Sequence, residues 1–170
     1  GTALATAGAA APTGTPADIL GGLIGLDEIR NELGGLINVI EGMKRDGNFV
    51  RMNYNLILVG NSGTAKSLIG DLFFQALKRL EVVSKEKPIF VDGSEFVDYD
   101  VEAVTKLITN AVGGMVIIDN AQGLIDGGEA VAPLKRLLVE MDTHQGDPVV
   151  ILSGLPGGLR EFVRDEWNAN

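Results

Sequence analysis

Residues 56–67 read Leu-Ile-Leu-Val-Gly-Asn-Ser-Gly-Thr-Ala-Lys-Ser. An apolar run, Leu56–Val59, leads into a glycine-containing loop, Gly60–Ser67, and a helical pattern follows it. This order of strand, loop and helix is the context of a phosphate-binding P-loop, whose backbone N–H groups wrap the phosphates. Lys66 would reach the β- and γ-phosphate oxygens, and the Ser67 hydroxyl would ligate Mg²⁺. The stretch therefore predicts a nucleotide site.

One position departs from the P-loop pattern, because Ala65 stands where the second glycine belongs. A methyl group is a small intrusion, and the loop tolerates it only if the backbone there avoids positive φ. We therefore expect this loop to bind nucleotide although it departs from the P-loop pattern at Ala65.

The composition limits which kinds of protein this chain can be. The chain has 170 residues, 45% of them hydrophobic, no cysteine and a net charge of −9. This length supports one domain with a core, and the acidic balance argues against nucleic acid or an anionic membrane as the main partner. No apolar run approaches the roughly 20 residues of a membrane span. We expect a cytoplasmic protein, without disulfides or thiol chemistry.

The chain is expected to divide into a flexible lead-in of Ala, Gly, Thr and Pro over residues 1–17 and a nucleotide-binding core over residues 18–170. Because the chain begins with Gly1 rather than Met, we expect it to be a piece of something longer.

Apolar runs alternate with helical patterns along the core. Short continuous apolar runs suit a parallel sheet covered on both faces, so the pattern predicts a doubly wound α/β fold. A helix should open at Asp27, and Gly34 and Gly35 should weaken or kink it. Ser94 is a candidate N-cap, and His144 is expected in an exposed polar loop. The expected strands are 55–59, 88–92, 115–119 and 148–153, and the later helices are 67–81, 101–112, 129–141 and 157–166.

A second motif, Met115–Asn120, is an apolar strand that ends in an acid. Asp119 would hold Mg²⁺ through water, as the acid of a Walker B strand does. The next residue is Asn120, where ring-forming ATPases carry a glutamate that polarises the attacking water. Loss of a general base costs about 10²–10⁴ in rate, so we expect ATP binding with slow or absent hydrolysis. We interpret Asn120 as a natural replacement rather than one introduced to trap ATP, because Ala65 is a second departure.

Together these motifs resemble the AAA+ family, in the branch that contains the red-type Rubisco activase and stage V sporulation protein K. The resemblance covers about residues 20–166, with Gly60–Ser67 as Walker A and Gly113–Ala121 as a degenerate Walker B. It implies an α/β P-loop NTPase fold, the AAA+ large subdomain, with ATP or ADP and Mg²⁺ as ligands. Ser67 and Asp119 are the implied metal ligands. The implied nucleotide-binding residues are Ile24 and Gly25 against adenine, with Gly60, Asn61, Ser62, Gly63, Thr64, Ala65, Lys66, Ser67 and Leu68.

The resemblance also implies hexameric rings that pull on a protein client through pore loops. Tyr99 falls where the family places its gripping aromatic, but Asp98 and Asp100 add charge and the glycine that normally follows is missing. The alternative is that Phe96 is a core residue and Tyr99 belongs to a surface turn. Ser153 is the candidate sensor of the γ-phosphate.

Several family parts have no match in this chain. No arginine matches the arginine finger, and we expect the fifth strand and the helical lid to be absent. The edge of the P-loop strand should then be exposed.

Three functions remain open at this point. The first is an ATP- or ADP-binding module with weak turnover, which serves as a structural or regulatory unit in a ring or tandem array. The second is an active ATPase that remodels a protein client, in which Glu95 or Asp126 approaches the water. The third is a protein-interaction scaffold that no longer binds nucleotide; Ala65 is its only support.

Overall fold

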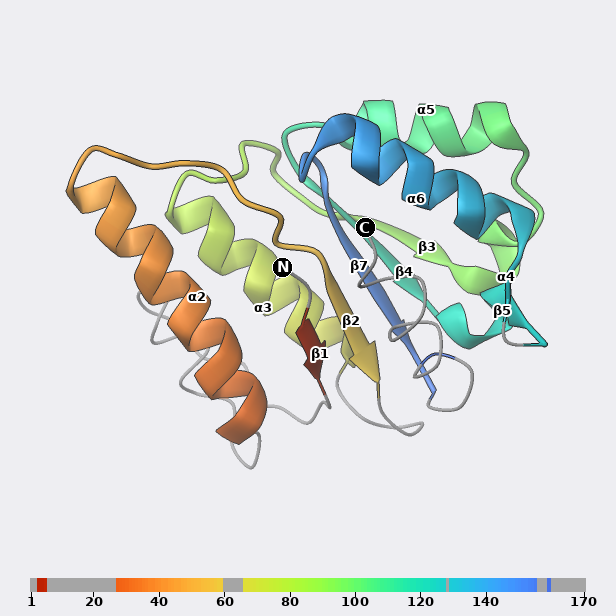
Figure 1. Ribbon diagram of the computed structural model, residues 1–170, viewed down its shortest axis with the longest axis horizontal. Helices are drawn as coiled ribbons and strands as arrows, with labels where there is room; N and C mark the ends of the chain where they lie inside the picture. Colours follow the sequence, from red (N-terminus) through yellow and green to blue (C-terminus); the bar gives the residue numbers. More distant parts are fainter. Residues whose placement is uncertain (1–2, 6–26, 60–65, 128, 156–158, 160–170) are drawn as a thin grey trace.

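A parallel five-stranded sheet, with strand order β1-β2-β7-β4-β3, forms the centre of the protein (Figure 1). The computed structural model describes residues 3–5, 27–59, 66–127, 129–155 and 159. The strands of this sheet are β1 Ala3–Ala5, β2 Leu56–Val59, β3 Ile89–Asp92, β4 Met115–Asp119 and β7 Val149–Gly154.

Helices cover both faces of the sheet, as the alternating pattern predicted. One core layer joins α2 and α3 to β2, and the other joins α5 and α6 to the opposite face. The helices are α2 Asp27–Arg45, α3 Lys66–Arg79, α4 Gly93–Phe96, α5 Val101–Ala111 and α6 Ala132–His144, with a 3₁₀ turn η1 at Ala121–Leu124.

The central strands β4 and β7 are buried on both faces of the sheet. All six residues of β7 are buried, and in β4 only Asp119 is partly exposed. Alternate residues of β4 enter the two core layers: Ile117 packs towards α3, and Ile118 packs towards α6. Gly70 lets α3 approach closely, because a Cβ there would lie 3.0 Å from Ile117 Cδ1.

The edge of β2 is covered, which differs from the expected exposed edge. Ala3–Ala5, part of the predicted flexible lead-in, pairs in parallel with β2, and Leu4 stands opposite Ile57. The physical reason is that an edge strand offers unpaired N–H and C=O groups that an extended segment can bind through its backbone alone. The sheet therefore has a fifth strand, drawn from the start of the chain.

The helix expected at 129–141 instead begins at Ala132 and runs to His144. Glu129–Ala130 forms a short strand, β6, antiparallel to β5 at Ile125–Asp126. Pro133 lies in the first turn of α6, where its missing N–H costs nothing. His144 is consequently a helix residue, and its side chain is 27% exposed rather than free in a loop.

The structure differs from two smaller predictions. The N-cap of α4 is Asp92 rather than Ser94, because its carboxylate accepts the Ser94 N–H at 2.9 Å. The helix α2 is continuous through Gly34 and Gly35. The expected last helix, 157–166, lies outside the described residues except for Leu159, which is buried.

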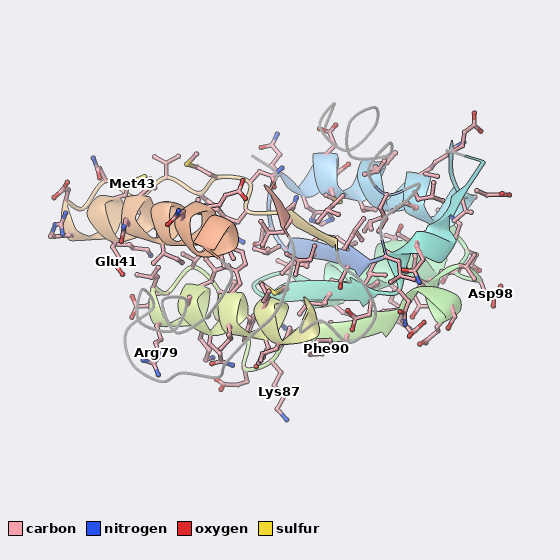
Figure 2. All side chains as sticks on the ribbon, turned by 90° about the horizontal axis from the view of Figure 1, so that it is seen from below. Glu41, Met43, Arg79, Lys87, Phe90 and Asp98 are labelled. Carbon is pink, nitrogen blue, oxygen red and sulfur yellow. The ribbon has the colours of Figure 1, made fainter. Side chains whose placement is uncertain are left out.

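The outer strand β3 leaves an apolar side chain at the surface. Phe90 is 51% exposed there (Figure 2), on the same side of the sheet as α3. Among the helices that the structure describes, none combines the length and the apolar character that crossing a bilayer requires.

Candidate nucleotide-binding site

Polar side chains form a row at the carboxyl end of the sheet. Asp92 on β3 stands opposite Asp119 on β4, and Ser153 on β7 stands opposite Leu58 on β2. Strand alternation places all three polar residues on the face that α3 covers, because their neighbours Val91, Ile118 and Leu152 pack into the opposite layer. Ligands of parallel α/β sheets bind beyond this end of the strands, so the row marks the candidate site.

The helix α3 begins at Lys66, directly after the predicted P-loop. Lys66 and Ser67 lie in its first turn, where backbone N–H groups favour an anion. Leu68 is partly buried against the core. The remaining predicted nucleotide-binding residues lie outside the described residues: Ile24, Gly25, Gly60, Asn61, Ser62, Gly63, Thr64 and Ala65.

Asn120 adopts a left-handed backbone conformation, with φ 55° and ψ 40°. Asparagine and aspartate are among the few non-glycine residues that tolerate this conformation. The Asn120 amide Nδ2 donates a hydrogen bond of 2.7 Å to Asp92 Oδ2. The residue that replaces the expected glutamate is thus tied to a carboxylate on the next strand.

Within the described segments, three donors hold the Asp92 carboxylate in place. In addition to Asn120, the Ser94 backbone N–H and the Ser94 hydroxyl donate to its Oδ1, at 2.9 and 2.7 Å. The hydrogen bonds from Ser94, and then the one from Asn120, lower the pKa of Asp92. The exposed Asp92 carboxylate is therefore ionised at neutral pH.

The backbone packs tightly where β3 and β4 end. A Cβ on Gly93 would lie 2.9 Å from the Asn120 carbonyl carbon and 3.0 Å from the Asp119 carbonyl oxygen. Glycine therefore lets α4 begin directly against the end of β4. Beside this contact lies an open depression of about 570 Å³, which is lined by Asp92, Gly93, Ser94, Val97, Asn120, Gln122 and Gly123.

Ser153 is almost completely buried, at 1% exposure. Within the described segments, its hydroxyl has no hydrogen-bond partner. Buried polar atoms normally have one, so this orphan hydroxyl suits a site that receives a polar ligand. A phosphate oxygen or a water bound to Mg²⁺ would satisfy it, and the carboxylate of Asp119 suits a hard cation. Ser153 and Asp119 therefore fit the nucleotide phosphate and the Mg²⁺ that the sequence predicts.

The predicted pore residue Tyr99 lies in the turn between α4 and α5. Its ring packs on Phe96, with centroids 5.2 Å apart, and its hydroxyl donates to Glu95 at 3.4 Å. Phe96 itself is fully buried. Phe96 is thus a core residue and Tyr99 a turn residue, and the pore role of Tyr99 stays a prediction. Glu95, one of the alternative bases, is engaged by that tyrosine, and Asp126 lies exposed on β5.

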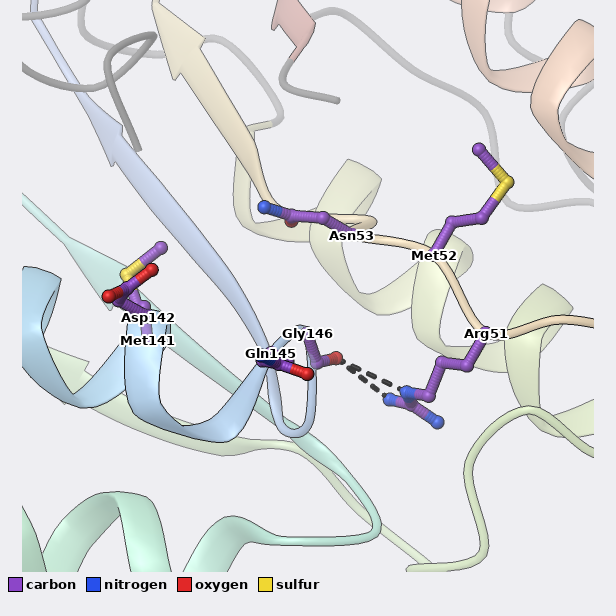
Figure 3. Close-up of a pocket in the computed structure, with 7 residues that line it drawn as sticks. All are labelled: Arg51, Met52, Asn53, Met141, Asp142, Gln145 and Gly146. Carbon is purple, nitrogen blue, oxygen red and sulfur yellow. Dashed lines mark hydrogen bonds between the residues drawn. The ribbon is translucent and has the colours of Figure 1, made fainter.

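A second depression lies at the opposite, amino-terminal end of the sheet (Figure 3). Its volume is about 290 Å³, and Arg51 lines it. The Arg51 guanidinium donates to the Gly146 carbonyl at 3.0 and 3.3 Å and to the Val82 carbonyl at 2.8 Å. These bonds join the segment before β2 to the loop after α6, so Arg51 has a structural role there.

Comparison with known proteins supports the AAA+ resemblance at a coarse level. No family model matches the chain. The chain is similar to stage V sporulation protein K of Bacillus subtilis (strain 168), with 27% identity over 154 residues. The match covers 83% of this chain and 47% of the relative, so the chain spans about half the length of that protein. This distant similarity, together with the parallel α/β sheet, supports a nucleotide-binding module of the AAA+ type.

The sequence analysis singled out Asp119, Asn120 and Ser153 but missed Asp92 as a site residue. An acid that closes an apolar strand was the signal, since Asp92 ends β3 as Asp119 ends β4. The sequence around Asp92 had indicated only a turn before the next helix.

Proposed function

We propose that this chain is an ATP- or ADP-binding AAA+ module that hydrolyses ATP weakly or not at all. It would serve as a structural or regulatory unit in a ring, hexameric in the simplest case, or in a tandem AAA+ array. The observation that carries this proposal is that β2 ends at Val59 and α3 begins at Lys66, so the sequence that matches a P-loop stands between a parallel strand and a helix.

The proposed residue roles follow from chemistry. Lys66 would contact the β- and γ-phosphates, and Ser67 with Asp119 would hold Mg²⁺, which neutralises phosphate charge when bound. Ser153 would sense the γ-phosphate through the buried hydroxyl that has no partner among the described residues. Weak turnover follows from Asn120, because an amide can orient water but accepts its proton poorly.

Titration calorimetry with ATP, with and without Mg²⁺, tests this proposal when turnover is read on the same sample. We expect clear binding with turnover that is slow or at background. ATP at 100 times Kd should raise the free energy of unfolding by about 2.7 kcal/mol. The absence of ATP and ADP binding would refute the proposal.

Lys66→Ala is the variant that tests the P-loop, and Lys87→Ala is its matched control. Both remove one positive charge, but Lys87 is an exposed residue before β3 (Figure 2). We expect Lys66→Ala to abolish ATP binding and Lys87→Ala to leave it unchanged. Equal affinities for ATP in the two variants would contradict the assignment of Lys66.

An active ATPase that remodels a protein client is the second candidate function. The contact between Asp92 and Asn120 favours it, because this contact brings a carboxylate to the position where the family glutamate is missing. Rapid turnover in the calorimetry sample would place this candidate first. A scaffold without nucleotide would follow only if neither ATP nor ADP binds.

A further inference from the structure

We propose that Asp92 holds and deprotonates the attacking water in this site, and that Asn120 positions the Asp92 carboxylate for it. This inference rests on the ATP binding proposed above. It assigns the residual hydrolysis to a residue on the neighbouring strand rather than to the one that follows Asp119.

The first support is register. Asp92 and Asp119 are direct partners on adjacent parallel strands, and strand alternation assigns both positions to the α3 side of the sheet. Neighbouring strands lie about 4.8 Å apart, so the two residues lie side by side at the carboxyl end of the sheet. A water beside a cation held at Asp119 would lie within reach of Asp92.

The second support is the hydrogen-bond count at Asp92. A carboxylate offers about four acceptor positions. Ser94 uses two of them, both at Oδ1, and Asn120 uses one, at Oδ2. Among the described residues, one acceptor position therefore remains at Oδ2, next to the Asn120 amide, and Asp92 lines the open depression.

The third support comes from Ser153 and does not involve the two carboxylates. Ser153, in the same polar row, has a hydroxyl that is buried to 1% exposure and has no partner in the part of the chain that is described. This atom indicates that the row receives a polar ligand. Asp92 and Ser153 flank Asp119 from the two neighbouring strands, which is the arrangement expected around a phosphate-bound cation.

The proposed step conserves atoms and charge. The water oxygen forms a bond to the γ-phosphorus while the bond from that phosphorus to the β–γ bridging oxygen breaks, and its electron pair stays with ADP. Asp92 accepts the water proton and later releases it to solvent. Because the hydrogen bonds to Asp92 make it a weak base, the step should be slow.

Asp92→Asn tests the role of the carboxylate, with Asp98→Asn as a matched control. Asn keeps an oxygen that can cap α4, and Asp98 is an exposed acid in the turn after that helix (Figure 2). We expect Asp92→Asn to lower single-turnover hydrolysis by about 10²-fold. The ATP Kd from calorimetry should stay unchanged. Asp98→Asn should match the parent protein in both measurements.

A second readout does not depend on turnover. ADP with aluminium fluoride mimics the transferring phosphate with its attacking water, and transition-state mimics report groups that act in that state. Asp92→Asn should weaken binding of this mimic by about the factor lost in turnover, with ADP affinity unchanged. Exchange of the pair, Asp92→Asn with Asn120→Asp, should recover part of the loss, because it returns a carboxylate to the contact between these two positions.

Asp92→Ser provides the same test if Asp92→Asn does not fold, because serine is also a good N-cap and carries no carboxylate. Unchanged turnover in whichever of the two variants folds would overturn the role of Asp92. A parent protein that binds ATP without turnover above Lys66→Ala would also overturn it, while leaving the proposed binding function intact. A parent protein that does not bind ATP would overturn both.

Discussion

At the scale of single residues, Asn120 satisfies a backbone requirement as well as a chemical one. Its φ of 55° is left-handed, which costs most side chains about 1–2 kcal/mol. We expect Asn120→Ala to be about 1 kcal/mol less stable than Asn120→Gly, because both remove the hydrogen bond to Asp92 but only alanine carries the Cβ that disfavours this backbone. Urea unfolding of the two variants measures this difference. Equal stability would show that the backbone at this position relaxes.

Gly93 is the residue at which a single methyl group should disturb the site. Its Cβ would meet the carbonyl groups of Asp119 and Asn120, which are backbone atoms that cannot rotate away. We expect Gly93→Ala to lower the free energy of unfolding by about 1–3 kcal/mol in urea titrations. Gly123→Ala is the control, because a Cβ at Gly123 would have nothing within 4 Å. A similar loss in both variants would point to a general effect of removing glycine.

At the scale of elements, a buried carboxylate joins α5 to α6. Glu140 is only 5% exposed, and its Oε1 accepts from Thr105 at 2.8 Å and from Arg136 at 2.6 Å. His144 Nε2 lies 3.5 Å from the other carboxylate oxygen. Burial alone would raise the pKa of Glu140, but the hydrogen bonds from Thr105 and Arg136 and the charges of Arg136 and His144 outweigh it and lower the pKa.

A lowered pKa in the folded state gives a defined pH dependence. The stabilisation is present above the usual carboxyl pKa of 4.5 and is lost as the pH falls through the lower folded value. We expect Glu140→Gln to cost about 1–3 kcal/mol at pH 7 and to flatten the acid limb of the stability curve. Urea unfolding between pH 7 and the acid limb measures both effects. Glu102→Gln, at an exposed acid of α5, should leave the curve unchanged; a parallel change would contradict the assignment to Glu140.

The sequence predicted the main strands and helices to within one or two residues at most boundaries, because buried strands and amphipathic helices have different periods. The start of α6 was wrong, although Pro133 in its first turn was an available signal. The strand Ala3–Ala5 could not have been predicted from its side chains, because backbone pairing to β2 requires no apolar pattern. The element order, by contrast, was enough to predict the parallel α/β class.

At the scale of the whole molecule, the site brings together residues that are distant in the chain. Asp92 and Asn120 are separated by 28 positions, and their contact exists only because β3 pairs with β4 in one register. Sequence motifs identified Asp119 and Asn120, since these follow a recognisable strand. The carboxylate beside them required strand order and register, which a single sequence leaves open.

The pairing of the chain start with β2 also places the candidate site in a continuous sheet. Without β1, the strand β2, which leads into the predicted P-loop, would be an edge strand with backbone groups open to water. We expect deletion of residues 1–5 to speed hydrogen exchange by about tenfold at those Leu56–Val59 amides that face β1 rather than β7, because a net hydrogen bond is worth about 1 kcal/mol. Leu4→Ala keeps every backbone group of β1 and should leave that exchange unchanged.

Exchange measured by NMR or mass spectrometry decides between the two outcomes, and unchanged protection after the deletion would mean that β1 does not hold β2. Because β2 leads towards Lys66, a loosened β2 should also weaken the proposed ATP binding in the deletion variant but not in Leu4→Ala.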